Sequence, residues 1–580
     1  MKYYCQLLVL NFTRTFFEKG EVNLKNKTNW TVRLQGPLGK VLEHFSACRL
    51  EKIDFSALLE PLRRRNGASC GRELLLWGQA VEVSAMACRY LDNSKLQRKV
   101  RQTVNDLIEL QKENKALSAY PEAQQLQQWD IYARRSILKA LAAVCRTPGE
   151  SGPVRQCCLD MVSALMEQVG EGKRSILHCG QFGGLDSSAI LDALVDVWHI
   201  SEDSSVLQFA RYIAGCGGSQ QHNIFAALQT GLAPSELGNG HAVYLNHCFQ
   251  GIAELSLIDK DRAPFWRNCC RTYLDKLISE ELFVTGSAGG RNDEGSYWCK
   301  GALAQGEKKC QGGPFGNSAV TVSNLQLFEA CHRALQTPLP VDWAERICYN
   351  ALLGAWEPGT CSWSFRNPTP LTGPCIKEYA AGNLPLDFCS FAAASGIVLA
   401  PALAALPLEE EEGLRINFYE DMELVSDSGI TVRIRGNFPA SDRVTLKIKS
   451  RKKFPLALRI PEYCTGVYYE DCLLKAEKNS YLTLNRSWSE EESLTLVFDS
   501  QVRVVPLPGN QPFQALMLGP LLLAESTGEE PAEYLRKIQY NKRPLIDYAS
   551  AGRPLNGNAP FNILFPLQEY AYLLNYFKRD

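Results

Sequence analysis

The amino-acid sequence predicts a mixed fold with separate α and β domains, in which a toroid of paired helices is followed by an antiparallel β-sandwich. Apolar residues recur every three or four positions through most of residues 70–405, which is typical of helices. From about residue 414 to 525, short alternating and β-branched runs dominate instead. The chain of 580 residues also exceeds the size at which one hydrophobic core stops growing, so two or three domains are expected.

The helical part is evident in stretches such as LLLWGQAVEVSAMACRYL and SSAILDALVDVWHI, whose connections contain Gly, Pro and Asn. Helices are expected at 73–90, 94–113, 131–146, 153–169, 186–199, 203–214, 243–258, 263–280, 319–335, 341–355 and 388–402. Because these helices arrive in consecutive pairs, they suit a ring of inner and outer helices. Loops at one end of such a ring would surround a central cavity.

The β part is evident in GITVRIRGNF, RVTLKIKS, FPLALRIP, SYLTLNRSW and SLTLVFD, which are evenly spaced and separated by turn residues. The acidic run Glu409–Glu412 before them is expected to be a solvated linker. We therefore divide the chain into an N-terminal segment, a helical domain, a β-sandwich and a C-terminal segment, at 1–40, 41–407, 408–545 and 546–580. The two end segments are expected either to complete the sandwich or to clasp the toroid.

Charge and composition exclude several classes of function. The chain has 62 basic and 63 acidic residues, a net charge of -1, which gives no long-range attraction for nucleic acid or an anionic membrane. Its 21 cysteines form no regular framework, which favours a reducing, cytoplasmic location. The N-terminal stretch MKYYCQLLVLNFTRTFF lacks a cleavage site, and no later stretch approaches a membrane span. No phosphate loop, dinucleotide fingerprint or zinc-finger spacing is present.

Several separated motifs follow one another along the chain. WDIYARRSILKAL and GHAVYLNHCFQGIAELSLI precede DWAERICYNALLGAWEPG at 342–359, and FPLALRIPEY, SYLTLNRSWSEEESLTLVF and FQALMLGPLLLAES follow in the β part. This ordered set, which spans about 70–525, resembles glycoside hydrolase family 127, the β-L-arabinofuranosidase-like proteins. The resemblance implies an (α/α)6-barrel catalytic domain with one or two β-sandwiches. It also implies an exo-acting glycosidase with an oligosaccharide substrate, and it leaves a homodimer open.

One glutamate matches the acid/base position of that family. The stretch FVTGSAGGRNDEGSYW, at 283–298, resembles the family's Thr-Gly loop with a glutamate before an aromatic residue, which gives the role to Glu294. A glycoside leaves as an alkoxide unless it is protonated, so a carboxylic acid beside the leaving oxygen is the minimum requirement. As a residue alone, a glutamate in a Gly-rich loop is more often solvated than catalytic.

The zinc site of the family is not matched. The resemblance implies a zinc ion held by one glutamate and three thiolates, one of them the nucleophile. At the corresponding positions this chain has Asn317, Ala319 and Phe388, and only Cys389 remains. One thiol cannot hold zinc, so no metal and no cofactor are expected. Cys389, which could be a packing residue, a ligand or a nucleophile, is then expected to pack beside the substrate.

A second carboxylate, Asp387, lies one residue before the position of the missing thiolate. Opposite Glu294 it would act as a nucleophile at short separation, or as a base that positions water at longer separation. The alternative is that Asp387 caps the helix that begins near Phe388. The sequence does not give the separation of the two carboxyl groups.

Other residues are expected to bind the sugar. His241 and His178 match family positions where an imidazole faces the substrate, while Trp129 and Asp130 are expected at the rim. Indole rings stack on apolar sugar faces, and carboxylates accept hydroxyl protons. Phe365 stands where the family tends to have tyrosine, so a hydroxyl contact is lost there.

Three functions remain to be compared. The leading hypothesis is a glycosidase that uses Glu294 without the zinc-cysteine nucleophile. The alternative is a catalytically inactive relative that binds carbohydrate or acts as a partner subunit, which the changes at Asn317, Ala319 and Phe388 would produce. A lyase or epimerase would need a Tyr or His base with arginines facing an acidic sugar, and the sequence shows no compelling cluster of this kind.

Overall fold

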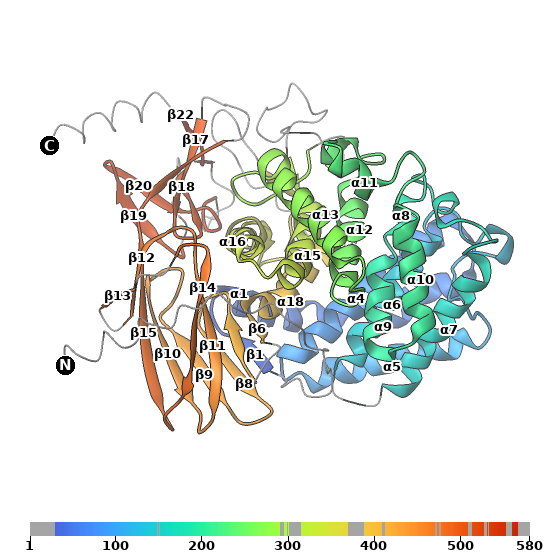
Figure 1. Cartoon of the computed structure of the whole chain (residues 1–580), viewed down its shortest axis with the longest axis horizontal. Coiled ribbons are helices and arrows are strands. Elements are labelled where there is room, and N and C mark those ends of the chain that lie inside the picture. The colour runs from blue at the N-terminus through green and yellow to red at the C-terminus, as the bar shows by residue number, and fades with distance from the viewer. Residues whose placement is uncertain are drawn as a thin grey trace.

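The structure of the chain is a computed structural model. It describes residues 30–147, 149, 151–290, 295–298, 300, 315–368, 388–408, 412–469, 472–474, 477–507, 513–526, 531, 533–552 and 560–566. In these residues the long helices form one half of the molecule and the larger sheets form the other half (Figure 1). Among the helices described, none is both long enough and apolar enough to cross a membrane.

Six helices in the described part of the chain form a closed inner ring. Each helix contacts the next one in the series, and the last returns to the first. The inner helices are α4 (Ala68–Tyr90), α6 (Asp130–Cys145), α9 (Leu191–Ser201), α12 (Ala242–Leu255), α15 (Ser318–Leu335) and α18 (Phe388–Ala404).

Outer helices alternate with the inner ones along the sequence and pack against them. They are α1 (Pro37–Cys48), α5 (Ser94–Gln111), α7 (Gly152–Gln168), α10 (Ser204–Gly215), α13 (Ala263–Lys276) and α16 (Leu339–Arg346). Short helices in the connections are α2 (Phe55–Leu58), α3 (Glu60–Arg64), α8 (Leu185–Ser188), α11 (Ile224–Gln229), α17 (Leu353–Ala355) and the single turn η4 (Ile176–His178). Inner and outer rings together confirm the predicted (α/α)6 barrel.

The two rings differ in how much of each helix is buried. In α5 the buried residues Leu96, Val100, Val104 and Leu107 recur every three or four positions, so this outer helix buries one face. In the inner helix α12 almost every residue is buried, polar ones included. A helix surrounded on all sides loses its polar face, and the polar side chains that remain on it must face a partner or a cavity.

The β half contains two sheets that pack as the predicted sandwich. The larger sheet has the order β1-β8-β9-β10-β15-β12-β13, and the smaller has the order β14-β11-β7-β6. The strands of the larger sheet are β1 (Trp30–Leu34), β8 (Met422–Ser426), β9 (Thr431–Arg435), β10 (Arg443–Lys449), β12 (Cys464–Tyr469), β13 (Cys472–Leu474) and β15 (Glu492–Ser500). Those of the smaller sheet are β6 (Ala405–Pro407), β7 (Leu414–Ile416), β11 (Lys453–Ile460) and β14 (Ser480–Ser487).

Burial alternates along β10, a central strand of the larger sheet. Val444, Leu446 and Ile448 are buried, whereas the residues between them are half-buried or exposed, as a strand with one face in a core requires. By contrast, β11 is buried from its second residue onward. The pair formed by β7 and β11 is parallel, whereas the other pairs described in the sandwich are antiparallel.

A third sheet follows the sandwich, with the order β16-β17-β18-β20-β19 and two further strands at its side. Its strands are β16 (Arg503–Pro506), β17 (Phe513–Leu518), β18 (Leu521–Ser526), β19 (Lys537–Tyr540), β20 (Arg543–Asp547), β21 (Phe561–Asn562) and β22 (Phe565–Pro566). Two short ribbons contact helices of the barrel, β2 (Phe315–Asn317) with β5 (Arg366–Pro368), and β3 (Trp356–Glu357) with β4 (Ser362–Trp363).

Buried polar contacts join the barrel to the sheets. Arg459 of β11 donates to Asp342 of α16 at 2.5 Å and lies 2.5 Å from Glu345 of the same helix. Glu420 accepts from two backbone N–H groups in the first turn of α1 and from the hydroxyl of Tyr349. Because these groups are removed from water, each contact constrains how the two halves are oriented.

Candidate functional site

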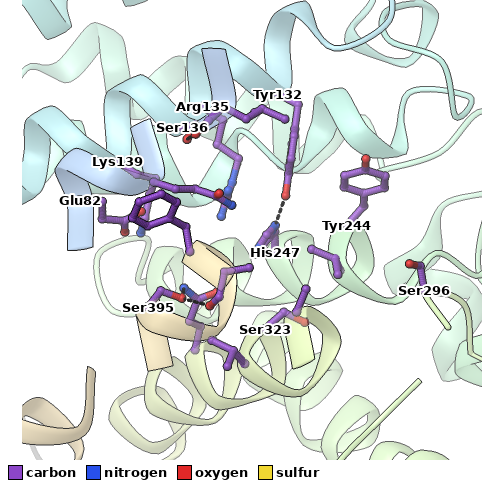
Figure 2. A pocket seen from close by; sticks show the side chains of 18 of the residues that line it. Glu82, Tyr132, Arg135, Ser136, Lys139, Tyr244, His247, Ser296, Ser323 and Ser395 are labelled. Carbon is purple, nitrogen blue, oxygen red and sulfur yellow. Dashed lines mark hydrogen bonds between the residues drawn. The ribbon is translucent and has the colours of Figure 1, made fainter. Parts of the chain in front are cut away.

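A cavity of about 260 Å³ lies inside the ring, between α4, α6, α12, α15 and α18 (Figure 2). Along α6 its lining runs from Trp129 through Tyr132 and Arg135 to Lys139, one helical turn at a time. Ten residues of helix span about 15 Å, so the cavity is a deep pit. We take as its mouth the end that lies at the N-terminal ends of the inner helices, where the lining includes the exposed Arg72 and the half-buried Trp129.

One wall of the cavity is aromatic. The ring of His241 stacks on that of Tyr244 with the centroids 4.0 Å apart, and Tyr132 meets Tyr244 edge to face at 4.9 Å. Trp129 extends this wall toward the mouth, 6.3 Å from Tyr132. Rigid aromatic faces of this kind provide contact area for the apolar face of a ring-shaped ligand at little conformational cost.

His241 carries an unsatisfied nitrogen into this wall. It lies immediately before α12, is 9% exposed and lines the cavity. In the described part of the structure its buried Nδ1 has no hydrogen-bond partner on another residue. Burial lowers the pKa of His241 to about 3, so the ring is neutral at physiological pH. A neutral imidazole has one donor and one acceptor nitrogen, which suits a hydroxyl group of a ligand.

The deeper part of the cavity is crossed by a chain of hydrogen bonds. The hydroxyl of Tyr132 lies 3.2 Å from Nδ1 of His247 (Figure 2). Gln326 donates to Ser395 at 3.3 Å. Gln326 also bonds His247, so the chain links α6, α12, α15 and α18. Burial, together with the nearby charges of Arg135 and Lys139, keeps the pKa of His247 well below its ordinary value.

Charged side chains form the floor. Arg135 makes two hydrogen bonds with the carboxylate of Asp192, at 2.8 and 2.5 Å, and Lys139 donates to Asp196 at 2.5 Å. Glu82 faces the same space from α4, and burial raises the pKa of its carboxyl group, an effect that Lys139 and Arg135 only partly offset. The floor can therefore offer both proton donors and acceptors to ligand hydroxyls.

None of these floor residues, nor His247, was identified from the sequence. Glu82, Arg135, Lys139 and His247 lie on helices that are otherwise buried, and nothing about their individual sequence contexts marks them. A usable signal was their spacing: Tyr132, Arg135 and Lys139 recur at three and four residues within an apolar helix. Polar residues that repeat on one face of a buried helix point into a shared polar space.

Three of the residues expected to bind sugar lie together. Trp129, His241 and Phe365 all line the cavity, although they come from three separate places, immediately before α6, immediately before α12 and in the loop after β4. The backbone oxygen of Phe365 accepts from Ser318 N at 3.0 Å, which holds its loop against the first turn of α15. These three side chains surround the mouth of the pit.

Two other expected sugar binders do not line the cavity. Asp130 is 1% exposed and accepts hydrogen bonds from Ser118 at 2.5 Å, from Leu126 N at 2.7 Å and from Arg134 at 2.7 Å. Its carboxylate is therefore occupied within the protein, where it holds the start of α6. His178 is an exposed residue of η4.

The two expected catalytic carboxylates, Glu294 and Asp387, lie outside the described residues. Cys389 belongs to the first turn of α18, but its side chain is likewise outside the described part of the structure. Ser296, two positions after Glu294 in the sequence, lines the cavity and is 9% exposed. The described chain thus reaches the cavity immediately after the segment that contains Glu294.

The described cavity residues do not fit the zinc ligands that the family resemblance implies. The side-chain oxygen of Asn317 accepts from the backbone N–H groups of Ala319 and Val320, at 2.8 and 3.2 Å, and so caps α15. Ala319 offers only a methyl group. Neither position supplies the carboxylate or thiolate that a zinc ion requires.

Comparisons with known proteins agree with this architecture. Residues 413–500 match the family model described as the GH127 middle domain of β-L-arabinofuranosidase. No curated protein matches the chain.

Solved structures resemble the chain over nearly its whole length. One, described as a GH127 β-arabinofuranosidase, has a TM-score of 0.73 at 14% identity and covers 93% of this chain and 97% of its own. A GH127 β-L-arabinofuranosidase from Geobacillus stearothermophilus T6 has a TM-score of 0.69 at 14% identity, with 92% and 100% covered. A protein described as a glycoside hydrolase has the same TM-score of 0.69 and identity of 14%, with 94% and 99% covered. At this identity the likeness establishes the fold.

Proposed function

Because the chain contains a GH127 middle domain and has the fold of GH127 enzymes, we propose that it is a glycoside hydrolase that removes terminal, arabinofuranose-like sugars from oligosaccharides. The observation that carries this proposal is the pit inside the helical ring, with a neutral His241 whose Nδ1 lacks a partner on another described residue.

The shape of the pit favours a terminal sugar over an internal one. Its volume of about 260 Å³ is small among ligand pockets, which suits one sugar unit rather than a long polymer. The charged side chains of Glu82, Arg135 and Lys139 lie at the end of the pit away from Trp129, and we take this end as the closed one, so that a chain enters only by its terminal sugar. An enzyme with such a pocket removes one terminal unit at a time, and the rest of the oligosaccharide extends from the mouth.

This orientation of the substrate distinguishes between two candidate general acids, Glu82 and Glu294. Glu82 lies at the floor and Ser296 on the opposite side of the cavity (Figure 2). The bond to be cleaved joins the buried sugar to the part outside, so the proton donor must stand near the mouth. Glu294, two residues from Ser296, suits that role, whereas Glu82 would bind hydroxyl groups of the buried sugar. We assign to Asp387 the second carboxylate function, as nucleophile or as base for water.

The assignment is tested by comparing Glu294→Gln with Glu82→Gln on two substrates, an aryl β-L-arabinofuranoside and an arabinofuranosyl disaccharide. Loss of a general acid lowers the rate about 100- to 10,000-fold. The loss is larger for the disaccharide, because a sugar alkoxide is a poorer leaving group than a phenolate. We expect Glu294→Gln to affect the disaccharide more than the aryl glycoside. Glu82→Gln should affect both equally. Equal rates for wild type and Glu294→Gln would overturn the assignment.

A second candidate function is carbohydrate binding without turnover. It is favoured by Asn317 and Ala319, which leave two expected ligand positions without a metal-binding group. The same substrates distinguish the two functions. Saturable binding measured by calorimetry, with no sugar released by wild type from either substrate, would support the binding function and exclude the hydrolase.

A further inference from the structure

A group of metal-binding side chains lies away from the cavity, where α1 meets the β3–β4 ribbon. His44 and Cys48 are four residues apart on α1, so both project from one face of that helix. Cys361 belongs to the turn between β3 and β4, where its φ of +50° directs the backbone through a tight bend. Residues more than 300 positions apart in the sequence are thereby brought together.

The three candidate ligand atoms lie close together. Among the described residues, His44, Cys48 and Cys361 form a group whose nitrogen and sulfur atoms all lie within 4.8 Å of one another. Nε2 of His44 is 3.6 Å from Sγ of Cys361. Zinc binds nitrogen at about 2.0–2.1 Å and sulfur at about 2.3 Å, so a tetrahedral centre holds the two atoms roughly 3.6 Å apart. The observed distance between His44 Nε2 and Cys361 Sγ is compatible with this geometry.

The surroundings also suit a metal site. Cys361 is buried, Cys48 is half-buried and His44 is exposed, so an ion can enter from the solvent side and be held from the protein side. The ring of His44 lies edge-on to Trp356 of β3, with the centroids 5.8 Å apart, which orients the imidazole. Two thiolates and an imidazole are ligands that select zinc over magnesium or calcium.

We propose that His44, Cys48 and Cys361 bind a zinc ion that ties the β3–β4 ribbon to α1, with the fourth coordination position taken by water. This site is distinct from the cavity and shares no residue with it. The role is structural, because the ribbon leads directly to Phe365 at the mouth of the pit. Ser318 also donates to the backbone oxygen of Ser364 at 2.5 Å, so a fixed ribbon fixes the start of α15.

Zinc alone is the probe. We would strip the whole protein of metal under reducing conditions, add zinc, and measure bound metal by elemental analysis and affinity by competition with a chelator. Cobalt(II) in place of zinc should show thiolate-to-cobalt charge transfer and the strong visible bands of a tetrahedral centre. Since loss of a residue that merely supports a ligand weakens binding about 10- to 100-fold, loss of a ligand should cost at least roughly 100-fold.

The variants are His44→Gln, Cys48→Ser and Cys361→Ser, with Cys88→Ser as a matched control from a half-buried helical position. We expect the first three to lose tight zinc binding and the control to retain it. Cys361 is buried, so Cys361→Ser could fail to fold. His44 is exposed, so His44→Gln tests the zinc site without altering a buried residue.

Two results would overturn the proposal. One is zinc binding that survives in His44→Gln and is lost in Cys389→Ser, since the ion would then belong to the cavity. The other is a Cys48–Cys361 disulfide found by mass spectrometry in protein purified without reductant, together with no zinc uptake after reduction.

Discussion

The guanidinium group of Arg459 lies 2.5 Å from a carboxylate oxygen of Glu345, and neither side chain is exposed to solvent. The pair joins β11 of the sandwich to α16 of the outer ring. Arg459 also bonds Asp342, so one cation is shared by two carboxylates at the same interface. Asp342 is itself so buried that its pKa rises to about 6, despite the attraction of Arg459.

Arg459→Met should destabilise the protein strongly. Removing the cation leaves Asp342 and Glu345 buried without compensation, which typically costs about 3–5 kcal/mol. Chemical denaturation followed by fluorescence would measure the loss. The control is Arg433→Gln, since Arg433 pairs with Glu423 at 2.6 Å with 55% of its side chain exposed. An exposed pair contributes roughly 0–1 kcal/mol. If Arg459→Met and Arg433→Gln lost equal free energies of unfolding, burial would not be the reason that the Arg459 pair stabilises the protein.

Glu420 should make stability depend on pH. Burial raises its pKa from 4.5 to about 7, although bonds from Leu38 N, Tyr349 and Gly39 N oppose the rise. The folded state therefore prefers the neutral acid. Its contribution is complete below pH 4.5, the ordinary value, and is lost as pH rises through about 7, at a cost of at most about 3 kcal/mol.

Melting temperatures between pH 5 and pH 8 test this sign. Glu420→Gln keeps a neutral side chain of the same size, so the variant should lose less stability than wild type as pH rises. An exposed carboxylate such as Glu477 provides the control, because Glu477→Gln should follow the wild-type curve. If the melting temperature fell more steeply with pH in Glu420→Gln than in wild type, Glu420 would not be the source of the pH dependence.

The sequence predicted the helical half well because each helix buries a long apolar face. Its errors fall where geometry departs from a regular helix. Residues 186–199 were expected to form one helix, but the structure has α8 and α9 with a break at Ala189 and Ile190. Apolar spacing continues through such a break, so periodicity alone cannot reveal it.

Contacts between residues far apart in the sequence could not be predicted as well as the helices. The alternation of Trp30, Val32 and Leu34 is visible in the sequence, yet only the structure shows that β1 joins the sandwich through β8. The cavity floor was missed for a related reason. Arg135 and its partner Asp192 are 57 positions apart, and nothing local indicates that they meet.

His241→Ala should weaken binding of an arabinofuranosyl ligand. Losing one hydrogen bond costs about 1 kcal/mol, roughly fivefold in Kd, and loss of the ring also removes its stacking on Tyr244. His241→Gln retains a donor and an acceptor and should recover part of the affinity. The loss of affinity from wild type to His241→Ala, measured by calorimetry, should be the same at pH 5 and pH 8, because the pKa of His241 is about 3 and its ring stays neutral at both. The control is His199→Ala, because His199 is exposed. Unchanged affinity in His241→Ala would exclude His241 from the binding site.

Gly78 allows α4 and α6 to approach so closely that both helices can line the pit. A Cβ atom at Gly78 would lie 2.6 Å from the carbonyl carbon of Ser136 and 2.7 Å from its oxygen. Backbone atoms cannot turn aside as a flexible side chain can, so Gly78→Ala must push the two helices apart. Overpacking of this kind costs about 1–3 kcal/mol.

The shift would also move Gln79 on α4 relative to Ser136 on α6, both of which line the pit, so ligand affinity should fall together with stability. Gly152 at the start of α7 is the matched control, because a Cβ atom there would have nothing within 4 Å. Gly152→Ala should be neutral or stabilising, since alanine loses less backbone entropy than glycine on folding. Denaturation and calorimetry on the two variants would measure both effects. Wild-type stability and affinity in Gly78→Ala would show that the inner ring can widen without changing the pit.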